Sequence, residues 1–484
     1  MPNAFAMLML MSWPLVCFVL LRRMPVERGL IWCILGGYLL LPPLANFDLP
    51  LIPPMDKKSI PSLCAFLIIV FMLHKKVPLL PAAPAGKLLV TIFMLSAIAT
   101  VLTNGETVVY SDGMGGGFRV SGLSVHDLLS AVIDQAIILL PFLMGRALLA
   151  SELGLRELLR AIMIGGLLYS VPALIEVRLS PQLNSWIYGF FQHDFIQMMR
   201  DGGFRPIVFL PHALWLAFFM FSALLSSAAL TRHASGETRM KMIFATIYLA
   251  GVLYLCKSLA SQLYALTFLP LALFASPKMQ IRATLILALI AISYPMLRNA
   301  ELVPLDAIVE RAATISDERA RSLAYRFDME QLLLGRAHEK PWFGWGGWGR
   351  NLILTPETGK AVTIPDGRWI IVFGVSGWLG YIAEMGLLAL PLVLLWRRAR
   401  GAGPLRISPY AAPVALILAA TMVDMLLNAT LIPLTWLCAG ALLGHAENPR
   451  LAADPAPAAA ERSQLFGNGP AIGRRRPKGR RTLL

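Results

Sequence analysis

Residues 296–351 read MLRNAELVPLDAIVERAATISDERARSLAYRFDMEQLLLGRAHEKPWFGWGGWGRN, and residues 363–374 read TIPDGRWIIVFG. They delimit a polar insertion, residues 297–368, between two hydrophobic runs that are each long enough to cross a bilayer. The insertion contains a charged helical pattern, then a turn rich in tryptophan and glycine, then a return to apolar sequence. We therefore expect a membrane scaffold on both sides and the chemistry within the insertion.

The composition is that of a membrane protein with many spans. Of 484 residues, 57% are hydrophobic and 15% charged, with a mean hydropathy of +0.65, whereas about a quarter of the residues in soluble domains are charged. We interpret the formal net charge of +15 as a determinant of orientation, because positive residues beside apolar segments stay on the cytoplasmic side. We expect no nucleic-acid partner. The five cysteines form neither a metal-ligand cluster nor a disulfide framework.

Thirteen apolar runs predict an all-α polytopic fold with about 12–13 transmembrane helices. Ten runs fall within residues 1–296 and three within residues 369–444, and the count becomes twelve if the first run does not span. The runs lie at residues 4–21, 29–46, 59–73, 87–103, 127–148, 157–176, 207–230, 242–256, 262–275, 281–297, 369–396, 409–428 and 430–444.

Basic residues occupy alternate loops, as expected of a cytoplasmic series. These loops contain Arg22, Arg23, Arg28, Lys75, Lys76, Lys87, Arg146, Arg156, Arg160, Arg232, Arg239, Lys241, Lys278, Arg282, Arg397, Arg398 and Arg400. The loops expected on the opposite, trans face are residues 47–58, 104–126, 177–206 and 297–368. Residues 445–484 are rich in Ala, Pro and Arg, and we expect a disordered basic cytoplasmic tail there.

Orientation does not explain the cations of the trans loops. Arg205 precedes Pro206 at a predicted membrane boundary, where a guanidinium either donates two parallel hydrogen bonds to a diphosphate or forms a structural ion pair. His212 either belongs to such a site or bonds to the backbone inside the bundle. Lys257, in the short link CKSLASQ, either snorkels or meets an anion.

The insertion itself predicts an amphipathic helix over residues 305–337, because apolar residues recur there at helical spacing between charges. Its polar faces carry Arg319, Arg321 and Arg326. Each of these is either a ligand for an anion or an ordinary solvated or paired residue, such as Arg326 with Glu330 one turn later.

A bend follows the predicted helix. Residues 342–349 hold four glycines and three tryptophans, a composition that excludes a helix. Trp342, Trp345 and Trp348 offer flat faces on which sugar rings can stack. The glycine spacing lacks the strand and the Lys-Ser/Thr pair of a phosphate-binding loop.

Several of these segments together resemble the O-antigen ligase and O-antigen polymerase superfamily of bacterial polysaccharide enzymes. The resemblance rests on "PWFGWGGWGRN", "TIPDGRW" and "VSGWLGYIAEMGLL", with support from "GGFRPIVFLPHALWLAFF" and "CKSLASQLYAL". It implies a GT-C-like helical fold in the bacterial inner membrane with its active face in the periplasm. It also implies glycan transfer from undecaprenyl diphosphate to an acceptor glycan or glycolipid, with membrane lipid and polysaccharide-assembly proteins as further partners and with neither metal nor other cofactor.

The same resemblance implies roles for particular residues. Asp366 would deprotonate the acceptor hydroxyl and Arg368 would orient a substrate. The diphosphate would be held by Arg205, Lys257, Arg319, Arg321 and Arg326, and substrates would be contacted by His212, His338, Trp342, Trp345 and Trp348. Two departures from the family pattern are Asp366-Gly367-Arg368 in place of a His-containing motif and Lys257 in place of an arginine. The first departure weakens the case for a lipid A-core ligase in particular, so a polymerase or exopolysaccharide-chain enzyme is at least as compatible.

A different class of protein stays open. Transporters and flippases also have about a dozen spans, and charges inside spans usually mark an ion or substrate pathway. The residues of this type are Asp134, Glu384 and Asp424. A non-catalytic subunit of an assembly machine is a third reading. Sequence alone does not identify the sugar.

Overall fold

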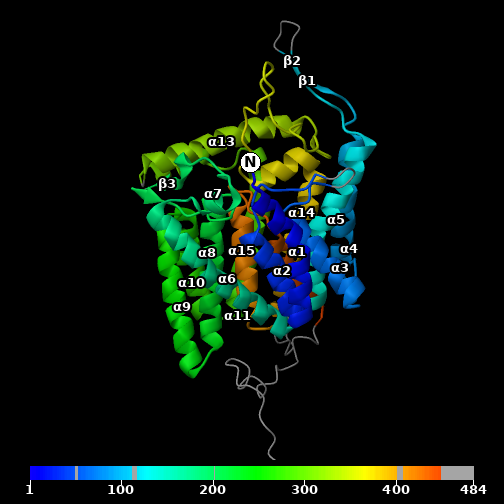
Figure 1. Ribbon diagram of the computed structural model, residues 1–484. Helices are drawn as coiled ribbons and strands as arrows, with labels where there is room; N and C mark the ends of the chain where they lie inside the picture. The colour runs from blue at the N-terminus through cyan, green and yellow to red at the C-terminus, as the bar shows by residue number, and fades with distance from the viewer. Residues whose placement is uncertain (49–52, 112–116, 201, 315, 401–406, 449–484) are drawn as a thin grey trace, which may run out of the picture.

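The computed structural model shows a bundle of long helices with a layer of short elements across one end (Figure 1). It describes residues 1–48, 53–111, 117–200, 202–314, 316–400 and 407–448. Most of the predicted tail, residues 449–484, lies outside the described residues.

Every predicted apolar run contains a helix of the bundle. The bundle helices are α1 (Ala4–Arg23), α2 (Val26–Leu40), α3 (Ser59–Leu67) with its π-helical continuation η1 (Ile68–Met72), α4 (Pro84–Leu102), α5 (Val125–Leu148), α6 (Glu152–Leu179), α8 (Ala213–His233), α9 (Gly236–Leu255), α10 (Leu259–Phe274), α11 (Pro277–Asn299), α14 (Arg368–Arg400), α15 (Ala411–Asp424) and α16 (Pro433–Glu447). Among the described residues, eight of these are long and apolar enough to cross a membrane, namely α1, α4, α5, α6, α8, α9, α11 and α14. The chain is therefore an all-α polytopic membrane protein, and the count of 12–13 spans stays a prediction.

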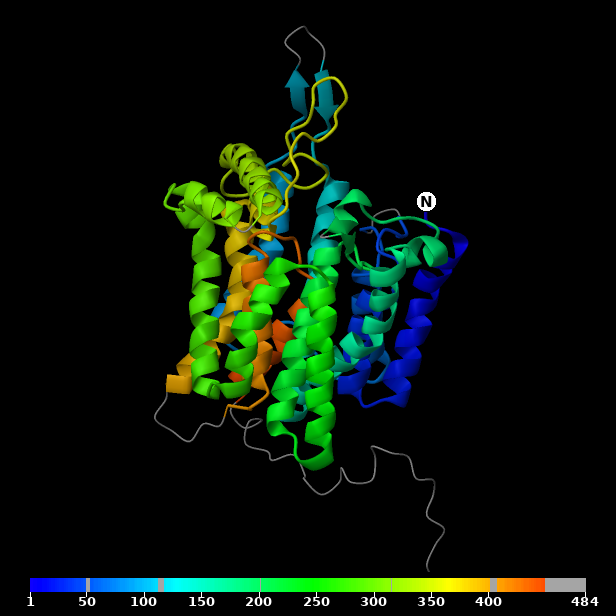
Figure 2. The ribbon, with the colours of Figure 1, turned by 90° about the vertical axis from the view of Figure 1, so that its left-hand side faces the viewer.

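The remaining elements lie at the end of the bundle where the chain begins (Figures 1 and 2). They are β1 (Val108–Ser111), β2 (Gly117–Val120), α7 (Leu183–Tyr188), the 3-10 helix η2 (Ile196–Met198), β3 (Met199–Arg200), β4 (Gly203–Phe204), α12 (Leu305–Ala313) and α13 (Asp317–His338). Each strand pair is antiparallel, and the β1–β2 hairpin projects away from the bundle. The described parts of the predicted trans loops thus share this end, which we call the trans end.

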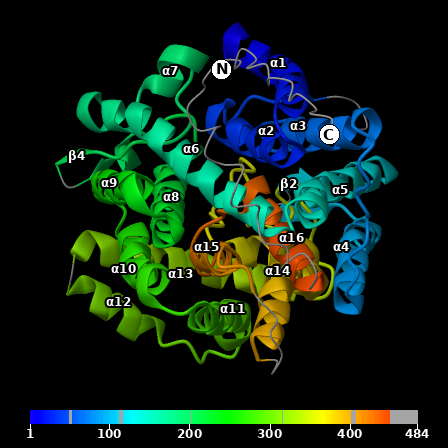
Figure 3. The same ribbon diagram turned by 90° about the horizontal axis from the view of Figure 1, so that it is seen from below.

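The centre of the bundle is formed by α8, α15 and α16, which lie inside the ring of other helices when the molecule is seen from below (Figure 3). The most apolar stretch of α8 is 89% buried. Small residues allow α16 to approach α5 closely, since a Cβ atom on Gly440 would lie 2.0 Å from the carbonyl oxygen of Phe142. This close packing fixes the helices that support the trans end.

The single helix predicted over residues 305–337 is wrong, because the chain forms two helices there. α12 ends at Ala313, and α13 begins after Ser316 with Asp317 and Glu318 in its first turn. Ser before two acidic residues is a typical helix start, because acidic groups favour the positive end of the helix dipole. α13 lies across the trans end and buries Phe327, Leu333 and Leu334, among others, against the bundle (Figure 1).

The predicted bend is confirmed, and it docks into a break in α14. Gly377 has φ 62°, which interrupts the helix. The amide of Trp345 donates to the carbonyl of Gly374 at 2.8 Å, and the amide of Trp378 donates to that of Pro341 at 2.8 Å. The bend therefore satisfies backbone groups that the break leaves without helical partners.

The boundary predicted for the tail is wrong by a few residues. α16 continues to Glu447, and His445 is buried, with its Nδ1 atom 2.9 Å from the Ala150 carbonyl. Glu447 accepts the amide of Ala83 at 2.8 Å and pairs with Arg146 at 3.5 Å. These contacts between distant loops extend the helix beyond the end of its apolar run.

Candidate functional site

The loop that carries Arg205 is held by backbone hydrogen bonds. The Arg205 amide donates to the Met198 carbonyl at 2.8 Å. Glu176, fully buried in α6, accepts the amides of Ile207 and Val208 at 2.8 Å each. Glu176 therefore fixes the path of the loop with its carboxylate. Sequence analysis did not find this residue, although a carboxylate so late in an apolar run was a signal.

The Arg205 side chain is a buried cation with unused donors. It is only 4% exposed, and its Nε and Nη2 atoms have no hydrogen-bond partner among the described residues. Burial, together with the nearby charges of Arg200, Arg326 and Arg319, lowers the pKa of Arg205 to about 10. The guanidinium thus stays charged at neutral pH, and no salt bridge joins it to a carboxylate in the described parts of the chain.

Arg326 of α13 pairs with Asp366, which directly precedes α14. Their Nε and Oδ2 atoms are 3.3 Å apart, and the Asp366 side chain is 36% exposed. Burial raises the pKa of Asp366 above its usual value, while Arg326 and His193 oppose that rise. The predicted helical pair of Arg326 with Glu330 is wrong, because Glu330 instead accepts from Arg298 of α11 at 3.0 Å.

His212 lies beside these groups but is occupied as a helix cap. Its Nδ1 atom accepts the amide of Leu214 at 2.9 Å at the start of α8. Its ring packs edge-on against His193, with ring centroids 4.4 Å apart. Burial lowers the pKa of His212 to about 3, with His193, Arg205 and Arg326 adding to the effect. His212 is therefore neutral at physiological pH.

We call Arg200, Arg205, Arg319, Arg326, Glu318 and Asp366 the cationic cluster. Glu318 forms an ion pair with Arg200, with 2.8 Å between the Oε1 and Nη2 atoms. Lys257 supports the cluster from below, since its Nζ atom donates to the Arg200 carbonyl at 2.9 Å. The structure brings Arg205, Lys257, Arg319 and Arg326 to one place, and their binding of a diphosphate stays a prediction.

Two predicted residues are not members of the cationic cluster. Arg321 is exposed on α13 at the edge of the cluster, where its charge acts on Glu318. His338 is exposed near the opposite end of α13, where its ring lies 6.0 Å from that of Phe373. The roles predicted for both residues stay predictions.

Arg368 faces a different compartment from Asp366, although only Gly367 separates them. Its guanidinium donates to the Glu384 carboxylate at 2.8 and 2.5 Å. Arg368 and Glu384 line a cavity of about 390 Å³. Arg368 and Asp134 also line an adjoining space of about 280 Å³. The two neighbouring spaces share Pro54, Asp134, Ile138 and Arg368 in their linings, and we call them together the cavity.

The cavity is lined by charged groups of both signs, together with apolar and uncharged polar residues. Asp134 of α5 and Lys58, just before α3, are both open to it, and Asp56 completes the set. The Lys58 Nζ atom also lies 5.7 Å from the ring centre of Trp215. Burial lowers the pKa of Lys58, while Asp56 opposes this effect. Sequence analysis named Asp134 and Glu384 only as charges inside spans.

The three tryptophans of the bend have different surroundings. Trp345 is 7% exposed, and its ring lies under the Arg336 guanidinium at 3.4 Å. Trp342 and Trp348 are 67% and 58% exposed, and Trp348 also lines the cavity. Only the last two have open rings, so a supporting role accounts for Trp345.

A buried arginine that sequence analysis overlooked holds the bend in place. Arg350 has no exposed surface and donates to the carbonyls of Trp345, Glu106 and Ser121 at 3.1, 3.0 and 2.8 Å. Glu106 also pairs with Lys340. Arg350 thereby fastens the base of the β1–β2 hairpin to the bend above the cavity.

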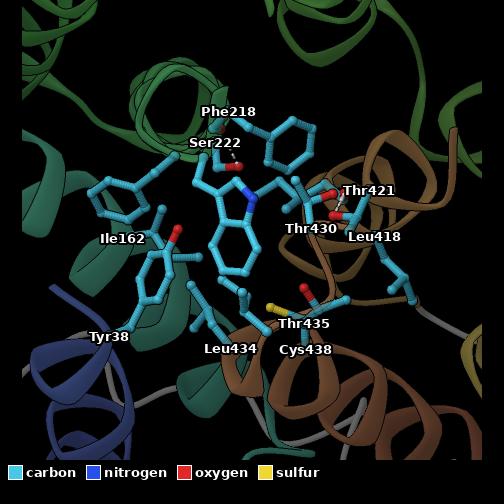
Figure 4. Close-up of a pocket in the computed structure, with 14 residues that line it drawn as sticks. Tyr38, Ile162, Phe218, Ser222, Leu418, Thr421, Thr430, Leu434, Thr435 and Cys438 are labelled. Atoms are coloured by element: carbon cyan, nitrogen blue, oxygen red, sulfur yellow. Dashed lines mark hydrogen bonds between the residues drawn. The ribbon is translucent and has the colours of Figure 1, made fainter. Parts of the chain in front are cut away.

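A further pocket in the centre of the bundle is too small for a substrate (Figure 4). Its volume is about 30 Å³, which is room for about two waters. The hydroxyls of Ser222 and Thr421 donate to carbonyls of their own helices at 3.0 and 2.9 Å. The pocket is therefore a packing defect between α8, α15 and α16, and not a site.

No protein-family model and no curated protein matches the chain. Among the described residues, no group of three or more His, Cys, Asp or Glu side chains is placed to hold a metal ion. The function is therefore inferred from the geometry of the cationic cluster and the cavity.

Proposed function

We propose that the chain transfers or polymerises a glycan carried on a polyprenyl diphosphate, with the cationic cluster binding the diphosphate at the trans end. The observation that carries the proposal is the buried Arg205 guanidinium with unused donors. An unpaired buried cation is costly, so a binding site for an anion explains why it is retained. In support of the proposal, Arg205 lies at the end of the apolar helices, where the headgroup of a lipid-linked anion would be presented.

The proposed mechanism uses three groups of the site, Asp366, Arg205 and Arg326. A hydroxyl oxygen of the acceptor forms a bond to the anomeric carbon of the donor sugar, and its proton passes to Asp366. The bond between that carbon and the diphosphate oxygen breaks, and the electron pair leaves with the diphosphate. Arg205 and Arg326 stabilise the negative charge that develops there. This single displacement inverts the anomeric centre.

The raised pKa of Asp366 suits this role. A general base works best when its pKa approaches the working pH. Arg326 opposes the rise in the pKa of Asp366 and lies 3.3 Å from its carboxylate, within the same site as the proposed leaving group. Asp366 and Arg326 thus act as a pair that donor binding rearranges.

The proposal is tested by binding of farnesyl diphosphate to the full chain in nanodiscs of zwitterionic lipid. Arg205→Ala should weaken binding about 10- to 100-fold, since a hydrogen bond to a charged group contributes about 1.5–3 kcal/mol. Arg205→Lys should keep part of the affinity, because lysine supplies the charge without the paired donors. Farnesyl monophosphate should bind more weakly than the diphosphate.

Arg311→Ala is the matched control, because Arg311 is an exposed arginine of α12 at the same end. Its affinity should equal that of the unaltered chain. Equal affinities in Arg205→Ala and Arg311→Ala would refute the anion site. In cells, loss of the chain should leave lipid-linked glycan on the trans face.

A second candidate function is transport, and the observation that favours it is the cavity with Asp134, Arg368 and Glu384 inside the bundle. Such residues commonly mark a substrate pathway. A flippase predicts that loss of the chain leaves lipid-linked glycan on the cytoplasmic face. The location of the accumulated lipid therefore decides between the two functions.

A further inference from the structure

The cavity and the cationic cluster differ in charge. The charged groups lining the cavity are three carboxylates and two cations, Asp56, Asp134, Glu384, Lys58 and Arg368, which gives a net charge of −1 if all are ionised. The cluster holds four arginines and two carboxylates, a net charge of +2. The cavity therefore has no excess of positive charge to attract phosphate or a uronic acid.

The arrangement of these charges also disfavours a bound cation. Arg368 occupies both oxygens of Glu384, and Lys58 and Arg368 both act electrostatically on Asp134. A metal or ammonium ion in this space would meet two fixed positive charges. What the lining offers is a mixture of hydrogen-bond donors and acceptors.

The size and the entrance fit a sugar. The main part of the cavity, about 390 Å³, falls in the range of about 300–1,000 Å³ typical of ligand sites. Apolar wall residues such as Val372 and Ile371 alternate with polar ones such as Ser130 and Gln135. Trp348 at the wall supplies an exposed aromatic face, against which the C–H face of a sugar ring can pack.

We infer that the cavity binds the accepting end of the glycan, and that the sugar bound there is uncharged. This inference rests on the proposed function and adds the chemical class of the acceptor. Arg368 is then a wall residue of the acceptor site, positioned by Glu384, and not a group that transfers protons.

The partition between the two compartments is thin. Gly367 separates Asp366 from Arg368, and a Cβ atom on Gly367 would lie 2.4 Å from the Leu426 carbonyl oxygen. The Arg368 amide donates to the Met425 carbonyl at 2.9 Å, which fixes this crossing. A sugar held beside Arg368 thus sits next to the segment that presents Asp366.

The test uses cysteine protection in the full chain, with the five natural cysteines replaced by alanine. Ser130→Cys places a thiol on the cavity wall, and its reaction with a water-soluble maleimide is timed. The probes are oligosaccharides released by mild acid from the surface polysaccharide of the cells that naturally carry the chain, separated by anion exchange into neutral and acidic fractions. The neutral fraction should slow labelling several-fold, and the acidic fraction should not.

Two variants sharpen the result. Asp134→Asn in the Ser130→Cys chain should raise the neutral sugar concentration needed for protection about tenfold, since a hydrogen bond to a charged acceptor is lost. Glu357→Cys, on an exposed loop, is the control and should label at one rate throughout. Unchanged farnesyl diphosphate binding by Asp134→Asn shows that the variant is folded.

The outcomes separate the two proposals. Protection by the acidic fraction, by neither fraction, or equally at Glu357→Cys overturns the inference. If Arg205→Ala loses diphosphate binding while no oligosaccharide protects, the proposed function stands and the acceptor cavity fails. If Arg205→Ala binds farnesyl diphosphate normally, the proposed function fails whatever the labelling shows.

Discussion

The cavity and the cationic cluster differ in how their arginines are paired. Arg368 in the cavity donates from Nε and Nη2 to the two carboxylate oxygens of Glu384, whose side chain is 3% exposed. Arg205 in the cationic cluster is more deeply buried than Arg368, yet two of its nitrogen atoms have no hydrogen-bond partner among the described residues. The ion pair of Arg368 with Glu384 stabilises the lining of the cavity. The unused N–H groups of Arg205 are able to donate to a ligand.

This difference teaches which arginine is the better candidate for binding an anion. The sequence placed Arg368 beside Asp366 at the end of the polar insertion, and the resemblance gave it the role of orienting a substrate. The contacts favour Arg205, because a diphosphate at Arg368 would have to displace a buried carboxylate. The following predictions test that distinction.

The largest expected effect concerns stability. Arg368→Ala leaves the Glu384 carboxylate buried without its partner, and we expect a loss of about 3–5 kcal/mol in the free energy of unfolding. Arg205→Ala removes an unpaired charge, so it should leave stability unchanged or raise it. Thermal unfolding of both variants in the same detergent measures the difference.

The double variant Arg368→Met with Glu384→Leu is the control for this prediction. It removes both charges and should recover most of the lost stability, because apolar pairs often replace buried ion pairs without loss. A drop in stability for Arg205→Ala as large as for Arg368→Ala would contradict the distinction.

An intermediate effect is expected in the pH dependence of transfer. Burial raises the pKa of Asp366 above the ordinary value of about 3.9, and Arg326 opposes this. As a base, Asp366 works only when ionised, so the rate should fall as the pH falls through the raised pKa. Arg326→Gln should move this acid limb to higher pH, which a pH–rate profile measures.

The contribution of Asp366 to stability depends on pH in the opposite direction to its contribution to the rate of transfer. Because its folded pKa is raised, the folded chain binds the proton more tightly than the unfolded chain. That contribution is complete below the unfolded pKa and is lost as the pH rises through the folded pKa. An acid limb that stays in place in Arg326→Gln, or that survives in Asp366→Asn, would exclude Asp366 as the base.

The smallest effect is expected at the wall of the cavity. Trp348→Ala removes one aromatic face, and we expect the KM for the acceptor to rise by up to about tenfold, from about 0.5–1.5 kcal/mol of stacking. Farnesyl diphosphate binding and thermal unfolding should not change, since the Trp348 side chain is 58% exposed. A weaker affinity for the diphosphate instead would move Trp348 to the donor side.

Much of the fold could be predicted because the membrane restricts it. Apolar runs must satisfy their backbone groups internally, so each of them becomes a helix. The bend was equally readable, because glycines and tryptophans at residues 342–349 leave no helical alternative. The break before α13 was also signalled, by Ser316 and the acidic residues after it, but helical periodicity across residues 305–337 hid it.

The partners of the charged residues were not readable. Periodicity suggests Arg326 with Glu330, yet Arg326 meets Asp366 and Glu330 meets Arg298 from α11. These pairs join segments far apart in the sequence, and local spacing carries no information about them. The structural roles of Glu176 and Arg350 were not predicted for the same reason, since their partners are backbone groups of distant loops.

The sequence by itself determined the helices, the bend and the grouping of the polar loops at one end, because these depend on local hydrophobicity and on backbone freedom. Only the tertiary structure decided that Asp366 and Arg368 line different spaces, and that two nitrogen atoms of Arg205 have no hydrogen-bond partner among the residues described. Which atoms are left unpaired depends on every segment packed around them, and that is settled when the helices come together.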